Sequence, residues 1–338
     1  MPLALNPPKL APTSKRWNHH LIMNPQLESI PLPGTDREIT RIGLGGMPLS
    51  LAGRPDRDAA KGVIRTAVQA GVTLIDTADA YALDHTDIGH NERLIAEAFG
   101  DMGLAIEDGP VVVATKGGRT RPDGDWDRDG RPQHLREACE ASLRALGVDR
   151  ITLYQFHSPD PRVPFADSVG TFARLREEGK IEAVGLSNVD VGQIEEARGI
   201  VPIASVQNAQ SVWDVGYTKS PVVEHCRRHG IVFLAYAPLG GSRRAGKLRE
   251  ASALVRLASE LDATPQELAL AWLLHQAPIV VPIPGASRPQ SVLSSVKAGS
   301  LDLDAAMLRR LRSAFRTLPG HRGFVERVGS KLKRLLGG

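Results

Sequence analysis

Aromatic residues and cysteines are both scarce in this sequence of 338 residues. Aromatic side chains make up 4% of the chain, and its two cysteines, Cys139 and Cys226, stand in no CxxC or Cys/His spacing. Two cysteines without such spacing indicate neither a disulfide framework nor one of the usual zinc motifs. Free cysteines fit a reducing compartment. We therefore expect a cytoplasmic protein.

Long apolar runs are absent as well. No stretch approaches the roughly 18 apolar residues that a membrane-spanning helix needs. The first seventeen residues hold several prolines and lack the apolar core of an export signal. We expect neither export nor membrane insertion.

The excess of positive charge is small and local. The formal net charge is +4, from 42 basic and 38 acidic residues, and the segment 321–338 holds five Lys or Arg against one Glu. Because nucleic-acid binding requires basic residues clustered along a face, we expect no nucleic-acid partner. Residues 319–338 read as a basic amphipathic tail, which predicts docking on its own domain or binding to a partner or an anionic lipid surface.

Short β-branched runs alternate with helical patterns from Ile42 onward, after an N-terminal arm, residues 1–28, that its Pro and Asn content predicts to be flexible. The predicted strands are Ile42–Gly45, Thr73–Asp76, Val111–Thr115, Ile151–Phe156, Ile181–Leu186, Ile203–Gln207, Ile231–Tyr236 and Ile279–Pro282. The predicted helices are Asp56–Ala70, Asn91–Phe99, Gln133–Leu146, Pro164–Glu178, Val191–Arg198, Pro221–Arg228, Leu248–Leu261, Pro265–His275 and Pro289–Val296.

This alternation predicts an α/β fold, a (β/α)8 TIM barrel over residues 29–318, with a doubly wound sheet as the alternative. An N-terminal β-hairpin at Ile30–Thr40 is expected to cap the barrel floor, and extra C-terminal helices begin with Leu303–Leu318.

Polar residues gather where four of the predicted strands end. The segments are Asp76–Tyr81, Thr115–Gly118, Phe156–Asp160 and Leu186–Asn188. In such barrels the chemistry takes place at the carboxyl ends of the strands. We expect these side chains to converge on one site.

Several motifs, in order along the chain, resemble those of the aldo-keto reductase family, and the likeness runs from the hairpin to about Leu318. They are Ile42–Met47, Gly71–Tyr81, Asn91–Leu94, Ala114–Gly117, Leu153–His157, Gly179–Asn188, Val206–Asn208 and Ala235–Gly240. Each motif alone is weak, but the ordered set is specific. The resemblance implies a nicotinamide-dependent reductase of small carbonyl compounds.

The resemblance further implies a catalytic tetrad of Asp76, Tyr81, Lys116 and His157. Carbonyl reduction needs a hydride for the carbon and a proton for the oxygen, and Tyr81 would donate the proton. A nearby Lys116 ammonium would lower the pKa of the Tyr81 phenol from about 10. Asp76 would hold the ammonium, and His157 would orient the carbonyl oxygen.

The sequence contains no strand-associated G-x-G-x-x-G, so a Rossmann dinucleotide site is unsupported. The segment Gly241–Lys247 matches a Walker A loop as far as its lysine, but Leu248 replaces the required Ser or Thr. In the resembling family this loop covers the cofactor pyrophosphate instead. An NTPase is therefore disfavoured.

The cofactor implied by the resemblance is NADP(H), and Arg288 suggests NADPH over NADH because a guanidinium suits the 2′-phosphate. Ser294 and Ser295 depart from the family pattern where adenine contacts are usual. The implied cofactor-binding residues are Gly46, Met47, Asp76, Ser187, Asn188, Gln207, Tyr236, Ala237, Leu239, Gly241, Arg243, Gly285, Ser287 and Arg288. Among them, Tyr236 would stack on the nicotinamide, and core packing is the alternative for its ring.

The substrate is expected to contact Tyr81, His157 and Trp126. Trp126 lies in the long polar loop Arg119–Arg131, which predicts either a lid over the substrate or an aromatic pinned to the barrel rim. Trp213 is open to the same two interpretations. The sequence determines neither the substrate's identity nor the oligomeric state.

Two other functions compete with the reductase. His85, Asp87 and His90 suggest a metal-dependent barrel hydrolase, but their spacing fits no standard zinc motif, and we expect no metal site. A redox-sensing binding subunit that keeps the reductase fold, as the potassium-channel β-subunits do, is the other alternative. The complete tetrad favours turnover.

Overall fold

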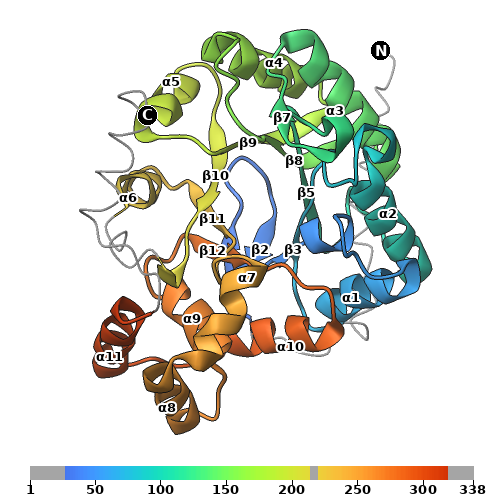
Figure 1. The fold of residues 1–338 in the computed structure, drawn as a ribbon. Coiled ribbons are helices and arrows are strands. Elements are labelled where there is room, and N and C mark those ends of the chain that lie inside the picture. Colours follow the sequence, from blue (N-terminus) through green and yellow to red (C-terminus); the bar gives the residue numbers. More distant parts are fainter. Residues whose placement is uncertain (1–26, 214–219, 319–338) are drawn as a thin grey trace, which may run out of the picture.

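Eight parallel strands form one sheet that closes on itself (Figure 1). The computed structural model describes residues 27–213 and 220–318. The order of the strands around the sheet is β12-β11-β10-β9-β8-β5-β4-β3. The strands are β3 (Leu44–Gly45), β4 (Leu74–Asp76), β5 (Val112–Gly117), β8 (Ile151–Phe156), β9 (Ile181–Ser187), β10 (Ile203–Ala209), β11 (Val232–Tyr236) and β12 (Val280–Ile283). All eight predicted strands are present, with ends that differ by at most two residues.

Strand β3 closes the barrel against β12. The Gly43 amide donates to Pro282 O and the Gly45 amide to Pro284 O, both at 3.0 Å, and Gly45 bridges Gly285 in parallel. A Cβ added at Gly45 would lie 2.8 Å from Ile283 O, closer than van der Waals contact allows. The first and last strands therefore meet through a glycine, and the predicted barrel is confirmed over the doubly wound sheet.

Helices surround the barrel, as Figure 1 shows. They are α1 (Arg57–Gln69), α2 (His90–Met102), α3 (Pro132–Leu146), α4 (Phe165–Glu177), α5 (Val191–Arg198), α6 (Pro221–Arg228), α7 (Ser242–Ala245), α8 (Ser252–Glu260), α9 (Pro265–Leu274), α10 (Pro289–Ala298) and α11 (Ala305–Arg316). N-terminal capping residues determine where two of these helices begin. Helix α9 begins with a capping box between Thr264 and Glu267 and has Pro265 in its first turn, and α1 begins after an Asp56 cap.

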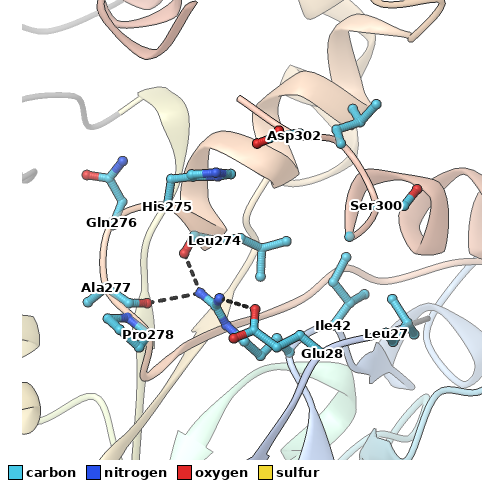
Figure 2. Close-up of a pocket in the computed structure, with 13 residues that line it drawn as sticks. Leu27, Glu28, Ile42, Leu274, His275, Gln276, Ala277, Pro278, Ser300 and Asp302 are labelled. Atoms are coloured by element: carbon cyan, nitrogen blue, oxygen red, sulfur yellow. Dashed lines mark hydrogen bonds and ion pairs between the residues drawn. The ribbon is translucent and has the colours of Figure 1, made fainter. Parts of the chain in front are cut away.

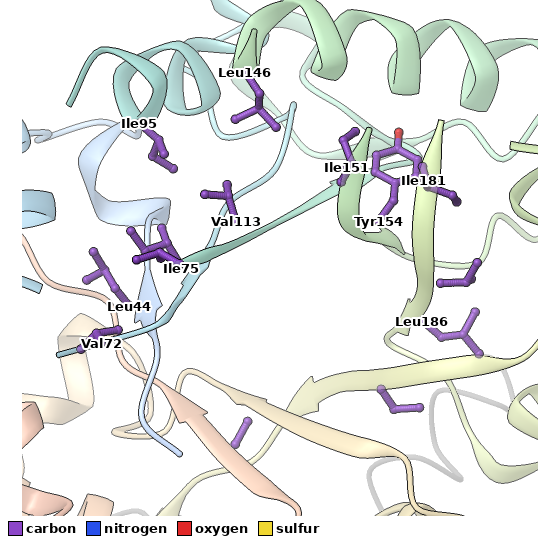
Figure 3. Close-up of a cluster of buried hydrophobic side chains, with 14 of the residues drawn as sticks. Leu44, Val72, Ile75, Ile95, Val113, Leu146, Ile151, Tyr154, Ile181 and Leu186 are labelled. Carbon is purple, nitrogen blue, oxygen red and sulfur yellow. The ribbon is translucent and has the colours of Figure 1, made fainter. Parts of the chain in front are cut away.

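Apolar side chains fill the space between strands and helices (Figure 3). Outward-facing Val113 and Tyr154 meet Ile95 and Leu146 from the helices. Burial of this kind contributes roughly 25 cal/mol per Å² of apolar surface removed from water.

A second apolar cluster fills the barrel interior. Leu74, Leu153 and Leu234 belong to it, and Leu32 and Ile39 cover its lower end from the hairpin β1 (Ser29–Pro31) and β2 (Glu38–Thr40). The predicted hairpin floor is confirmed. Since strand side chains alternate between faces, the residue two positions beyond an interior position also faces inward. At the carboxyl end of the barrel these next inward-facing positions hold polar side chains, which form a layer beside the apolar cluster.

Two segments differ from the sequence expectation. The loop Arg119–Arg131 contains a short hairpin, β6 (Arg119–Thr120) paired with β7 (Asp127–Arg128), because its Pro-Asp-Gly turn folds it back. The predicted helix Leu248–Leu261 is divided into a 3-10 turn, Gly246–Glu250, and α8. Within the described residues, no helix has both the length and the apolar character to cross a membrane.

The predicted arm and tail lie almost entirely outside the described residues. Of the arm, Leu27 and Glu28 are described, and Glu28 pairs with Arg41 at 2.7 Å. The flexible character of residues 1–28 and the amphipathic tail 319–338 stay predictions.

A cavity of about 520 Å³ lies at the barrel floor (Figure 2). Arg41 lines it and donates to the carbonyls of Leu274 and Ala277. Ile42 precedes β3 and Ala277 precedes β12, so this cavity adjoins the amino ends of the strands. Because chemistry in such barrels belongs to the opposite end, we do not assign the active site here.

Candidate active site

A buried lysine stands at the centre of the polar layer. The Lys116 ammonium donates to Asp76 Oδ2 at 2.7 Å, to Thr77 O at 2.7 Å and to the Tyr81 hydroxyl at 3.0 Å. Lys116 is fully buried. An ammonium carries three N–H donors, so each of them has a partner and the group is fixed in position.

The ends of three strands bring the tetrad together. Asp76 ends β4, Lys116 lies near the end of β5, and His157 follows β8. Tyr81 comes from the turn after β4, and its ring lies 5.8 Å from that of His157, edge to face. Both rings are buried, with 6% and 8% of their surface exposed. The predicted convergence of these four side chains is what the structure shows.

Burial sets the protonation states of this cluster. It raises the pKa of Tyr81 well above its usual value of 10, and the negative charge of Asp76 adds to the rise. Burial, with the positive charges of Lys116 and Arg119, lowers the pKa of His157 well below 6.5. Near neutral pH the phenol thus keeps its proton and the imidazole is neutral.

The net lowering of the Tyr81 pKa that we expected is not found, because burial and the charge of Asp76 raise it. The negative charge of Asp76, 2.7 Å from the ammonium, offsets the positive field at the phenol, and burial disfavours the phenolate. Burial also lowers the pKa of Lys116 itself, against the pull of Asp76. Lys116 still favours the phenolate, because its ammonium donates a hydrogen bond to the Tyr81 oxygen at 3.0 Å.

Two glutamines bond to the Asp76 carboxylate, and one of them, Gln155, was not among the predicted site residues. Gln155 and Gln207 donate to Asp76 Oδ1 at 3.2 Å and 2.6 Å, and Gln207 also reaches Gln155 Oε1 at 3.3 Å. Gln207 was expected to bind the cofactor, and that contact stays a prediction. Gln155 lies two positions before His157 on β8, so strand alternation could have identified it.

Two more acidic residues are buried beside the tetrad and were also missed. Burial raises the pKa of Asp79 well above its usual range, with the charge of Glu92 adding to the rise. Burial likewise raises the pKa of Glu92, whose Oε1 accepts from Thr115 at 2.5 Å. The motifs Thr77–Tyr81 and Asn91–Leu94 contain these residues, but sequence alone does not reveal that both are buried.

The rim of the site is organised by Asn188. Its side chain donates to His157 O at 2.9 Å and to Ser187 Oγ at 3.1 Å, and accepts from the Tyr236 hydroxyl at 2.8 Å. Its backbone lies in the left-handed region, at φ 60°, a conformation that asparagine tolerates better than most residues. Tyr236 is half-buried: its ring packs against the barrel-interior cluster, and its hydroxyl reaches Asn188 at the rim. The predicted stacking on the nicotinamide stays a prediction.

The two candidate substrate tryptophans are in different environments. Trp126, 40% exposed, lies 6.3 Å from the His157 ring and 4.3 Å from the Arg121 guanidinium. Trp213 is buried in a separate apolar cluster, and its indole donates to Leu239 O at 2.9 Å. Trp213 therefore supports the loop after β11 rather than a substrate.

Loop residues of the predicted cofactor site lie after β11 and after β12. Ala237 and Gly241 have positive φ, and Gly241 and Arg243 are exposed. Gly285, Ser287 and Arg288 are exposed as well, after β12. Ser294 bonds to Glu267 at 2.5 Å and Ser295 to Ser291 O at 2.9 Å within the helix layer.

Gly46 and Met47 lie at the end of β3. The Gly46 amide donates to Asp76 O at 2.7 Å, and Asn91 donates to Gly46 O at 2.9 Å. A Cβ at Gly46 would lie 2.5 Å from Asn91 Oδ1, so the position requires glycine. Met47 is 42% exposed beside it.

The residues that suggested a metal-dependent hydrolase serve other contacts. His90 Nδ1 lies 2.8 Å from Ser50 Oγ, and Asp87 pairs with Arg54 at 2.7 Å. Among the described residues, Glu195, His225 and His229 place ligand atoms within 4.8 Å of one another, but Glu195 lies on outer helix α5, His225 on α6, and His229 directly after α6. Neither group lies with the tetrad.

Known proteins match this chain along most of its length. The model of the aldo/keto reductase family matches residues 41–316. An uncharacterized oxidoreductase of Schizosaccharomyces pombe is 33% identical over 283 residues, covering 82% of this chain and 87% of that protein.

Solved structures agree with this match. Glycerol dehydrogenase of Gluconobacter oxydans superimposes with a TM-score of 0.73 at 25% identity, over 86% of this chain and 96% of that one. An aldo-keto reductase of Klebsiella pneumoniae, solved in complex with NADPH, gives 0.70 at 26% identity, over 86% and 95%.

The closed barrel and the family match together make this chain a (β/α)8-barrel oxidoreductase. The chain belongs to the aldo/keto reductase family. It is accordingly an enzyme that carries out NAD(P)H-dependent carbonyl reduction. This confirms the nicotinamide-dependent reductase expected from the sequence motifs.

Proposed function

We propose that the chain reduces an aldehyde or ketone to its alcohol, with NADPH as the preferred cofactor and Tyr81 as the proton donor. The observation that supports this most is the bonding of Tyr81. Its hydroxyl accepts a hydrogen bond from Lys116 at 3.0 Å, and its ring lies 5.8 Å from the His157 ring. A carbonyl oxygen that binds beside His157 would lie next to the phenolic proton.

Reduced nicotinamide, when bound, supplies the hydride to the carbonyl carbon. His157 would bind the carbonyl oxygen as a neutral ring. Among the described residues its Nδ1 atom is buried without a hydrogen-bond partner, which fits a ring that bonds to a bound ligand. Tyr81 would transfer its proton to the oxygen as negative charge develops there, and Lys116 would then stabilise the phenolate.

The exposed residues after β11 and β12 fit the cofactor. Arg288 precedes α10, and within the described residues its guanidinium forms no hydrogen bond or ion pair, so it is available to a 2′-phosphate. Asn188 and Tyr236 would hold the nicotinamide at the rim, above the Ser187 hydroxyl. We place this catalytic unit in one domain, residues 29–318.

Steady-state consumption of NADPH across aldehydes, ketones, quinones and sugars tests the proposal. Turnover with some of these carbonyl compounds is the expected result. Slow cofactor exchange with negligible turnover of every class would contradict it and would favour a redox-sensing subunit.

A further inference from the structure

Arg119 and Arg128 lie directly opposite each other across the β6–β7 hairpin at the mouth of the barrel. Side chains of directly opposite residues share one face of a two-stranded ribbon, and like charges there are destabilising. Burial lowers the pKa of Arg119, and the positive charge of Arg128 lowers it further. The hairpin thus holds two positively charged side chains, Arg119 and Arg128, that repel each other.

The neighbouring carboxylates do not neutralise this pair. Asp160 is held by Arg162 at 2.9 Å and 3.1 Å, and Arg162 also lies 3.5 Å from Asp127. Within residues 27–213 and 220–318, neither the Arg119 nor the Arg128 guanidinium has a hydrogen bond or an ion pair. Both side chains are only partly exposed, so solvent compensates the two charges incompletely.

The two arginines line a cavity next to the tetrad. It has a volume of about 390 Å³, and Ser158 and Asn188 also line it. Ser158 follows His157 in the chain, and Asn188 bonds to His157 O. Arg119 also lies 5.8 Å from the Trp126 ring, which itself faces His157. A ligand in this cavity therefore lies beside the reacting groups.

We propose that the substrate is an anionic carbonyl compound whose carboxylate is bound by Arg119 and Arg128 while its carbonyl faces Tyr81 and His157. Guanidinium groups match the planar oxygens of a carboxylate and bond to them in a fork. An anion between the two arginines relieves their mutual repulsion. This inference rests on the proposed carbonyl reduction and names its substrate class.

Matched substrates test the inference with the full-length protein. The probes are 3-carboxybenzaldehyde and 4-carboxybenzaldehyde, each compared with its neutral methyl ester, and the measured quantity is the ratio of kcat/KM for acid over ester. The wild-type ratio is expected to exceed about 10 for at least one pair, since hydrogen bonds to charged groups contribute roughly ten- to hundredfold. It is expected to fall as ionic strength rises.

Arg119→Gln and Arg128→Gln are each expected to lower that ratio about ten- to hundredfold. Arg65→Gln, on the outer helix α1, is the matched control and leaves the ratio unchanged. A wild-type ratio near 1 for both pairs that neither variant changes would overturn the inference while the reductase activity stands.

A binding measurement separates this inference from the proposed function. Calorimetry of 3- and 4-(hydroxymethyl)benzoate with NADP⁺ and the full-length protein needs no turnover. If no aldehyde consumes NADPH, the proposed function fails, and the binding result decides the inference alone. Binding that Arg119→Gln weakens at least tenfold supports a carboxylate site; absence of binding, or binding that Arg119→Gln leaves unchanged, overturns it.

Discussion

The Lys116 ammonium lies 2.7 Å from Asp76 Oδ2, and both side chains are almost free of solvent exposure, at 0% and 2%. Removing one partner of such a pair leaves the other charge buried and uncompensated. Asp76 keeps two amide donors of its own, from Gln155 and Gln207, whereas Lys116 has one carboxylate partner. The pair therefore links stability to catalysis.

Lys116→Met is expected to lower the free energy of unfolding by about 3–5 kcal/mol, because Asp76 loses its counter-charge. The double variant Asp76→Asn with Lys116→Met has no buried charge at this position and should recover most of that loss without recovering carbonyl reduction. Urea unfolding and NADPH consumption measure the two effects. A single variant as stable as the wild type, or an active double variant, would contradict the assignment.

Asp79 makes stability depend on pH in the opposite direction from a salt-bridged carboxylate. Its raised pKa means that the folded protein retains a proton that the unfolded chain releases above about pH 4. Stability is therefore lost as pH rises from about 4 toward the folded-state pKa. Asp79→Asn, which mimics the protonated form, should be more stable than the wild type at pH 7, and this advantage should shrink toward pH 4.

Urea unfolding at pH 4 and pH 7 measures this difference, with Asp125→Asn, an exposed acid on the same side of the barrel, as the matched control. An advantage of Asp79→Asn that is equal at both pH values would show that the Asp79 carboxyl is ionised alike in the folded and unfolded states.

The His157 ring should remain neutral across the working range. Burial and two positive charges lower its pKa well below 6.5, so protonating it costs the folded state free energy, and stability falls as pH drops below about 6.5. NMR of the imidazole nitrogens should show no titration between pH 6 and pH 8. A midpoint near 6.5 would mean that His157 is solvated rather than enclosed.

Arg288→Ala is expected to raise KM for NADPH at least about tenfold while changing KM for NADH little, because only NADPH presents a 2′-phosphate to the guanidinium. Arg316→Ala, exposed on α11, serves as the control. Equal increases for both cofactors would argue that Arg288 does not read the phosphate.

Much of the barrel could be predicted from the sequence, and so could the convergence of Asp76, Tyr81, Lys116 and His157. Each strand ended close to the predicted residue, because β-branched runs and the polar residues after them are local features of the chain. The hairpin inside Arg119–Arg131 was expected only as a loop, since two-residue strands leave almost no pattern.

Other properties of the site depend on contacts between residues that are far apart in sequence, so local sequence patterns could not predict them. Gln207 is 131 positions from Asp76 in sequence, yet their side chains meet at 2.6 Å. The raised pKa of Tyr81 follows from burial that only the folded barrel creates. Likewise, the opposition of Arg119 and Arg128 appears once β6 and β7 have paired.

The most direct test of the central claim compares the wild type with Tyr81→Phe. This change removes the proton donor and leaves the ring, so NADPH should bind with unchanged affinity, measured by fluorescence titration, while carbonyl reduction falls about 10²–10⁴-fold. Near-normal turnover in Tyr81→Phe would contradict the assignment of Tyr81 as the acid.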